Sequence, residues 1–86
     1  MIVKYQLLTH VIYESEVRMK KGILTAREQE VFELLVLNKS TKEIAIFLGI
    51  SEKTVRNHIS NAMQKLGVKG RAQAVVELLK LGELTI

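Results

Sequence analysis

The sequence predicts an all-α fold, in which four helices follow an N-terminal extension of uncertain structure and two of them form a helix-turn-helix. Three observations support this fold class. The chain contains no proline, its glycines divide it from Gly22 onward into pieces of helical length, and two Ser/Thr-x-x-Glu signals each precede apolar residues at helical spacing. We expect residues 1–22 to form the extension and residues 23–86 to form one domain.

The first helix is expected to begin after Thr25. A hydroxyl at Thr25 can accept an unpaired backbone N–H, while the Glu28 carboxylate reaches back to the Thr25 N–H, so that the two residues form a capping box. The apolar spacing that follows predicts a helix to about Leu37, with Val31 and Leu34 facing the core.

The second helix should repeat this device, because Ser40 precedes Glu43 at the same spacing. The pattern predicts a short helix through Leu48, followed at once by Gly49, where a left-handed helix stop is needed. Ser51 can then cap the next helix. A short helix, a glycine-containing turn and a longer helix are typical of a helix-turn-helix, although an ordinary corner between two helices has the same spacing.

The third helix, over residues 52–66, should have two contrasting faces. Its apolar side chains share one arc, which we expect to face the core: Val55, Ile59, Ala62, Met63 and Leu66. The opposite arc carries hydrogen-bonding side chains and no carboxylate: Lys53, Arg56, Asn57, Ser60, Asn61 and Gln64. A merely solvated face would usually mix Glu with Lys at i, i+4.

That polar arc suits the edges of DNA bases. Arginine pairs with guanine, asparagine and glutamine pair with adenine, and serine pairs with either, so the candidate base-reading residues are Arg56, Asn57, Ser60 and Asn61. Other side chains of this helix are candidates for contacts with phosphate oxygens: Lys53, Thr54, His58 and Lys65. The alternative is a basic helix face that only faces water.

The distribution of charge supports a polyanionic partner. The net charge is +4, which by itself says little, but five basic residues and one acid lie between Ser51 and Arg71. The segment from Glu28 to Glu33 contains three glutamates and no Lys or Arg. One face is therefore expected to be electropositive and another not, as in proteins that bind a phosphate backbone.

The fourth helix, over about residues 71–81, is apolar on two sides. One stripe consists of Ala72, Val75, Val76 and Leu79, and the other of Ala74, Leu78 and Leu81. One stripe can close the core of the domain, and the other is left without a neighbour in so small a chain. We expect Ala74, Leu78 and Leu81 to form a two-fold dimer interface, unless the first twenty residues cover the second stripe.

The N-terminal extension carries no motif that identifies it. Apolar residues alternate through it as in a strand, yet a helix burying Tyr5, Leu8 and Ile12 is also compatible with the pattern. Three interpretations remain open: an element between subunits, a cover for the fourth helix, or a leader upstream of a natural start at Met19.

Several classes of function are disfavoured by what the sequence lacks. It has no cysteine and no aspartate, and its two histidines, His10 and His58, have no companions at metal-ligand spacing. We find no nucleophile–base pair and no phosphate-binding glycine loop, so we expect a non-enzyme without metal, cofactor or small-molecule ligand. No apolar run reaches the roughly 18 residues of a membrane span. We expect a cytoplasmic, nucleoid-associated protein.

From Leu24 to Leu84 the chain resembles the LuxR/NarL-type family of DNA-binding domains. The resemblance rests on five segments in order: LTAREQEV (24–31), KEIA (42–45), ISEKTVRNH (50–58), KLGV (65–68) and RAQAV (71–75). The run from Ile50 to Leu79 also closely resembles a stand-alone member of this family that regulates late spore development, which implies a role in sporulation.

The resemblance implies a sequence-specific regulator of transcription that binds double-stranded DNA as a homodimer through its fourth helix and acts on RNA polymerase. It implies base contacts by Arg56, Asn57 and Ser60. It implies phosphate contacts by Thr41, Lys42, Thr54, His58 and Lys65. The alternative function is a helical protein-interaction module that docks on the transcription machinery without reading DNA.

Overall fold

The computed structural model describes residues 22–85, which form four helices and contain no strand. The helices are α2 (Ala26–Val36), α3 (Thr41–Leu48), α4 (Glu52–Leu66) and α5 (Arg71–Lys80). Their order and type confirm the all-α prediction. The predictions for the N-terminal extension fall, apart from Gly22, outside the described residues.

Both predicted capping boxes are formed. At the start of α2, the Glu28 N–H donates to Thr25 Oγ1 (3.1 Å) and the Thr25 N–H donates to Glu28 Oε1 (2.9 Å). Ser40 and Glu43 make the same two hydrogen bonds at the start of α3, at 3.1 and 2.9 Å. Each box satisfies backbone donors that a helix start leaves unpaired, so these residues fix where the two helices begin.

The turn between α3 and α4 depends on Gly49. Its φ of 68° lies in the left-handed region, which glycine enters without the steric cost that a Cβ brings. The Ile50 N–H then donates to the Ala45 carbonyl at 3.0 Å, closing the end of α3. Ser51 Oγ accepts the Thr54 N–H at 3.0 Å and caps α4, so the end of α3 and the start of α4 are separated by three residues, Gly49 to Ser51.

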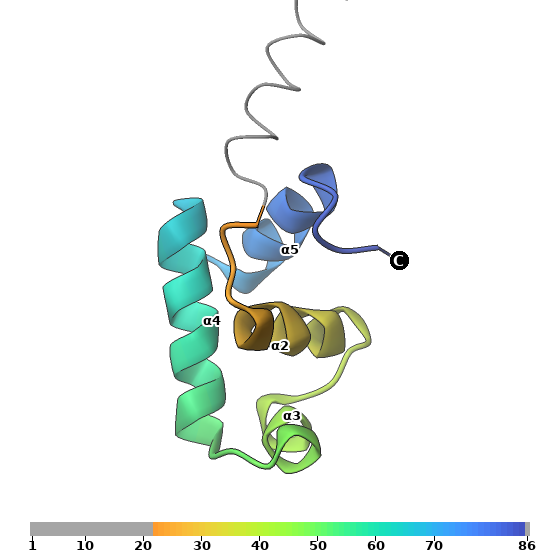
Figure 1. The fold of residues 1–86 in the computed structure, drawn as a ribbon, viewed down its shortest axis with the longest axis vertical. Helices are drawn as coiled ribbons and strands as arrows, with labels where there is room; N and C mark the ends of the chain where they lie inside the picture. Colours follow the sequence, from red (N-terminus) through yellow and green to blue (C-terminus); the bar gives the residue numbers. More distant parts are fainter. Residues whose placement is uncertain (1–21, 86) are drawn as a thin grey trace, which may run out of the picture.

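The core lies where α4 packs against the other three helices (Figure 1). Fully or almost fully buried apolar side chains come from every helix and from the C-terminal segment: Val31, Phe32, Ile44, Ala45, Val55, Ile59, Ala62, Leu66, Ala74, Leu78, Leu81 and Leu84. The arc of α4 predicted to face inward does so, with Met63 partly buried. Burial of this arc fixes which side of α4 remains in water.

The two ends of the described chain lie together near α5 (Figure 1). The Gly22 N–H donates to Glu83 Oε1 at 2.6 Å, and Gln29 Nε2 donates to the Glu83 carbonyl at 2.5 Å. These two hydrogen bonds hold the segment after α5 against the residues at the start of α2. The Gly22–Glu83 contact lies at the opposite end of the domain from α3 (Figure 1).

Candidate nucleic-acid interface

The outward face of α4 carries the four side chains predicted to read bases. Arg56, Asn57, Ser60 and Asn61 are all exposed. We call these four residues the reading face. The helix is held by Val55, Ile59, Ala62 and Leu66 on its opposite side, so the reading face is presented by a rigid, packed element. Its donors and acceptors are of the kinds that match base edges in a major groove.

The residues predicted to contact phosphate lie around this face on two helices. Lys53 is exposed in the first turn of α4, whereas Thr54 and His58 are half-buried on its flank. Thr54 Oγ1 lies 2.9 Å from Ser51 Oγ, which holds its side chain against the helix start. In α3, Thr41 is half-buried and Lys42 exposed in the first turn, where unpaired backbone N–H groups favour an anion.

Arg56 has a neighbour that the analysis of the sequence overlooked. Its Nη1 donates to Glu52 Oε2 at 3.1 Å, one helical turn earlier. Both side chains are well exposed, at 52% for Arg56 and 39% for Glu52, so this ion pair contributes little to stability. Arg56 can therefore leave Glu52 for a stronger bidentate partner. The sequence could have indicated this ion pair, because Glu52 and Arg56 are spaced i, i+4 on one helix.

Lys65 is placed differently from the expectation that it faces DNA. Its Nζ donates to Glu28 Oε1 at 2.7 Å, so the C-terminal end of α4 is tied to the first turn of α2. The Glu28 side chain is only 4% exposed and that of Lys65 is 34% exposed. The lysine ammonium thus neutralises a buried carboxylate, and Glu28 competes with any phosphate for it.

The environment of Glu28 keeps this carboxylate ionised. Burial acts to raise its pKa, but hydrogen bonds from Lys65 and Thr25 and the Lys65 charge together outweigh burial. The pKa of Glu28 consequently lies below its ordinary value. The same carboxylate accepts the Thr25 N–H, which completes the capping box of α2, and binds Lys65 at the C-terminal end of α4.

The prediction for the dimer interface is wrong in its choice of stripe. Ala74 and Leu78 are fully buried and Leu81 is 4% exposed, because this stripe of α5 closes the core of the domain. They are therefore not accessible to a second copy. The other stripe is the outer one: Ala72 and Val76 are exposed, and Val75 and Leu79 are partly buried. Both stripes are apolar, so helical periodicity alone did not distinguish them.

Residues 22–85 contain no cluster of three or more potential metal-ligating side chains. In the same part of the chain, no helix combines the length and apolar character needed to cross a bilayer.

Known proteins resemble this chain in both sequence and structure. Residues 22–78 match the family described as bacterial regulatory proteins, luxR family. The chain is 77% identical over 66 residues to the spore germination protein GerE of Bacillus subtilis (strain 168), covering 77% of this chain and 89% of GerE. The solved structure of the transcription factor GerE matches with a TM-score of 0.73 and 66% identity, covering 76% of this chain and 97% of that one.

A longer relative matches over the same region. The transcriptional regulatory protein DegU of Brevibacillus brevis is 51% identical over 69 residues, which is 80% of this chain but 29% of DegU. These relatives are regulators of transcription and not enzymes. The family match extends over more than half of the chain and includes the whole helix-turn-helix. The chain belongs to the luxR family of bacterial regulatory proteins, and it is a GerE-like, DNA-binding regulator of transcription.

Proposed function

We propose that this protein binds a specific double-stranded DNA sequence as a homodimer and regulates genes of late spore development. One observation supports the proposal of sequence-specific reading: the reading face of α4 is exposed and rich in hydrogen-bonding groups, and the carboxylate beside it, Glu52, holds Arg56 only by an exposed ion pair. The 77% identity to the spore germination protein GerE supports the sporulation role. It also disfavours the alternative of an interaction module that does not read DNA.

On DNA, α4 would lie in the major groove with Arg56 bidentate on a guanine. Asn57, Ser60 and Asn61 would then meet the neighbouring base pairs. Contacts with phosphate would fix the register of the helix and involve both helices of the helix-turn-helix: Thr41, Lys42, Lys53, Thr54 and His58. Lys65 would join them only by exchanging Glu28 for a phosphate oxygen.

A second copy would pack on the outer stripe of α5. This stripe borders a surface pocket that has both apolar and polar walls. The pocket is lined by Val68, Ala72, Gln73, Val76, Glu77 and Lys80. Val76 is 48% exposed, so this stripe has apolar surface that a second copy could cover. A two-fold contact here would set two α4 helices about one turn of DNA, roughly 34–36 Å, apart.

The experiment that tests sequence reading is selection from a randomised duplex library at near-physiological salt. We expect enrichment of a two-fold symmetric motif with half-sites about ten base pairs apart. Arg56→Ala should cost about 1–3 kcal/mol and relax the preference at one position, whereas the matched variant Lys42→Ala should weaken all sequences alike. Equal loss by Arg56→Ala on selected and random DNA would remove Arg56 as a base reader.

The dimer is tested separately by sedimentation. The full chain should be dimeric at tens of micromolar, and Val76→Glu should be a folded monomer, because a charge would be buried in the interface. A monomeric parent protein at that concentration would contradict the α5 interface and leave the reading of DNA by α4 untouched.

A further inference from the structure

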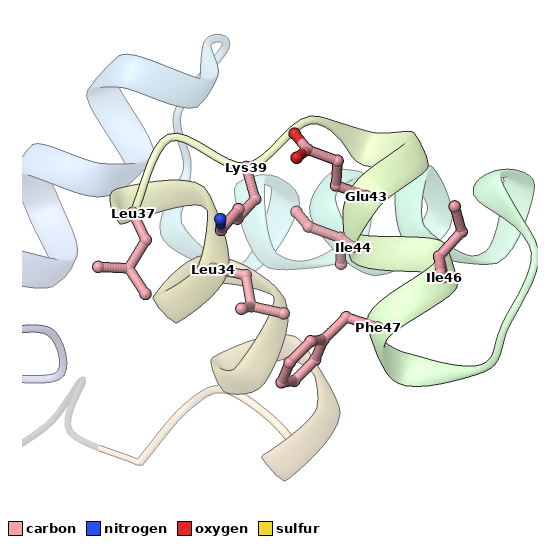
Figure 2. A pocket seen from close by; sticks show the side chains of 7 residues that line it. All are labelled: Leu34, Leu37, Lys39, Glu43, Ile44, Ile46 and Phe47. Atoms are coloured by element: carbon pink, nitrogen blue, oxygen red, sulfur yellow. The ribbon is translucent and has the colours of Figure 1, made fainter.

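The first turns of α2, α3 and α4 each contain a glutamate: Glu28, Glu43 and Glu52. In α2 and α3 the glutamate occupies the third helical position, where it closes a capping box. Figure 2 shows the Glu43 side chain at the pocket between α2 and α3, which it lines together with Lys39. The glutamates of α2 and α3 are thus explained by the way their helices begin.

Glu52 stands in a different position. Ser51 caps α4 by accepting the Thr54 N–H at 3.0 Å, so Thr54 takes the place that a glutamate has in α2 and α3. Glu52 is the first helical residue, and its Oε2 accepts a hydrogen bond from Arg56 Nη1 at 3.1 Å. Any acid in the first turn interacts favourably with the helix dipole. That benefit does not explain why this carboxylate binds the arginine proposed to read a base.

A carboxylate at this place opposes the binding of DNA. The Glu52 side chain is 39% exposed and lies beside the reading face. Its charge repels any phosphate that comes within a Debye length, roughly 8 Å at physiological salt. The ion pair also cancels the charge of Arg56, so this turn of α4 adds little to the general attraction for a polyanion. Glu52 therefore weakens every contact that brings a phosphate to Arg56.

The repulsion differs between the two acceptors that Arg56 can meet on DNA. A phosphate group carries a full negative charge, whereas O6 and N7 of guanine belong to an uncharged base. When Arg56 turns to a guanine, the protein loses an exposed ion pair of small value and brings no anion beside Glu52. When Arg56 turns to a phosphate, that phosphate comes to lie beside Glu52 and is repelled. Glu52 consequently opposes the phosphate contact more than the guanine contact.

We propose that Glu52 is a specificity-determining residue, which retains Arg56 on DNA of other sequences and releases it to a guanine in the correct site. It acts by weakening non-specific binding, because specificity is the difference between two affinities. This inference rests on the proposed function, since it requires Arg56 to read a base.

The chain contains a matched control for this ion pair. Arg27 and Glu30 form an exposed ion pair on α2, also with 3.1 Å between Nη1 and Oε2, and their side chains are 42% and 49% exposed. The proposed DNA contacts belong to α3 and α4 and not to α2. Glu30→Gln therefore makes the same change of net charge as Glu52→Gln and breaks the same kind of pair, but outside the reading face.

The test measures the affinity of the full chain for two duplexes of equal length, one with the selected site and one with the same bases scrambled. Glu52→Gln should bind the scrambled duplex about fivefold more tightly than the parent, because Arg56 becomes available to a phosphate. Its affinity for the selected site should change by less than about twofold. On the scrambled duplex, the slope of log affinity against log salt should become steeper by about one. Glu30→Gln should change both affinities by the same small factor.

Two further variants separate the route through Arg56 from an effect on the start of α4. In the Arg56→Ala background, Glu52→Gln should raise binding to the scrambled duplex no more than Glu30→Gln does. Glu52→Asp keeps the negative charge and should retain most of the parent's discrimination between the duplexes. Thermal melting of each variant checks that the fold is kept.

Three results would overturn the inference. An equal gain by Glu52→Gln on both duplexes would reduce the role of Glu52 to net charge. A gain that persists in the Arg56→Ala background would show that Glu52 does not act through Arg56. Loss of a preference for cytosine, in a site selection repeated with Glu52→Gln, would show that Glu52 contacts a base itself. Failure of the parent to distinguish the two duplexes would instead contradict the proposed function, which separates the two conclusions.

Discussion

The two ends of α4 are held in different ways. At its N-terminal end, Ser51 caps the helix and Gly49 makes the turn, and both lie within a few residues of the helix they fix. At its C-terminal end, Lys65 is bound by Glu28, a residue 37 positions earlier in the chain. One end is fixed by local backbone geometry alone, whereas the other end, besides its own left-handed stop at Gly67, is tied to another helix by a partly buried pair of charges.

This difference explains how the orientation of the reading face relative to the rest of the domain is fixed. The local turn determines where α4 begins, and burial of its apolar arc determines which side of the helix faces outward. The bond from Lys65 to Glu28 restrains the other end relative to α2. Because the Glu28 side chain is only 4% exposed, water screens its carboxylate little, and Lys65 is the cation bound to it. The local end should therefore tolerate change better than the distant one.

The largest effect is expected at the distant end. Lys65→Met keeps the aliphatic stem but leaves the Glu28 carboxylate buried without its cation, which should lower the free energy of unfolding by about 2–3 kcal/mol. Urea denaturation measures this loss. Lys69→Met removes the same charge from an exposed position and should change stability by less than about 0.5 kcal/mol. Equal effects of the two variants would show that the Glu28 contact contributes nothing beyond net charge.

A smaller effect is expected at the local end. Gly49→Ala puts a Cβ on a residue with φ of 68°, which should cost about 1 kcal/mol even though no atom lies within 4 Å of the added carbon. Gly70→Ala is the matched control, because φ at Gly70 is −139° and the new Cβ would meet only Gln73 Oε1 at 4.0 Å. If thermal melting places both variants at the same midpoint, the left-handed turn is not what holds this end.

The smallest effect is expected from acid. Because the pKa of Glu28 is lower in the folded protein than its ordinary 4.5, its contribution to stability is complete above that value and is lost as pH falls through the folded pKa. Urea midpoints measured from neutral pH downward should therefore fall more steeply for the parent than for Glu28→Gln. The pKa of Glu43 is also lowered, first by the Ser40 backbone N–H, but this residue is common to both proteins. Parallel curves would contradict a role for ionised Glu28.

The sequence was sufficient wherever a structure is set by near neighbours. Both capping boxes, the stop at Gly49 and the cap at Ser51 were predicted from spacing alone, since each is completed within four residues. The facing of α4 was also predictable, because its apolar and polar side chains fall on separate arcs. These features together gave the fold class and the exposure of the reading face.

Features that depend on distant neighbours were not predictable in the same way. The stripes of α5 are both apolar, so only packing against the rest of the domain reveals that Leu78 faces inward. The partner of Lys65 lies in another helix, and no local pattern indicates it. The exposure of Phe47 was hidden because five apolar residues in succession end α3, and such a run does not define one face.

The contact between Gly22 and Glu83 has a further consequence for how this domain can be built into larger chains. Because both ends leave from one edge near α5, a polypeptide attached at either end would start on the side of the domain away from α3 (Figure 1). Domains whose ends lie together tolerate circular permutation and insertion into a host chain. With this geometry, another domain could be fused to either end of the helix-turn-helix domain without covering the turn between α3 and α4.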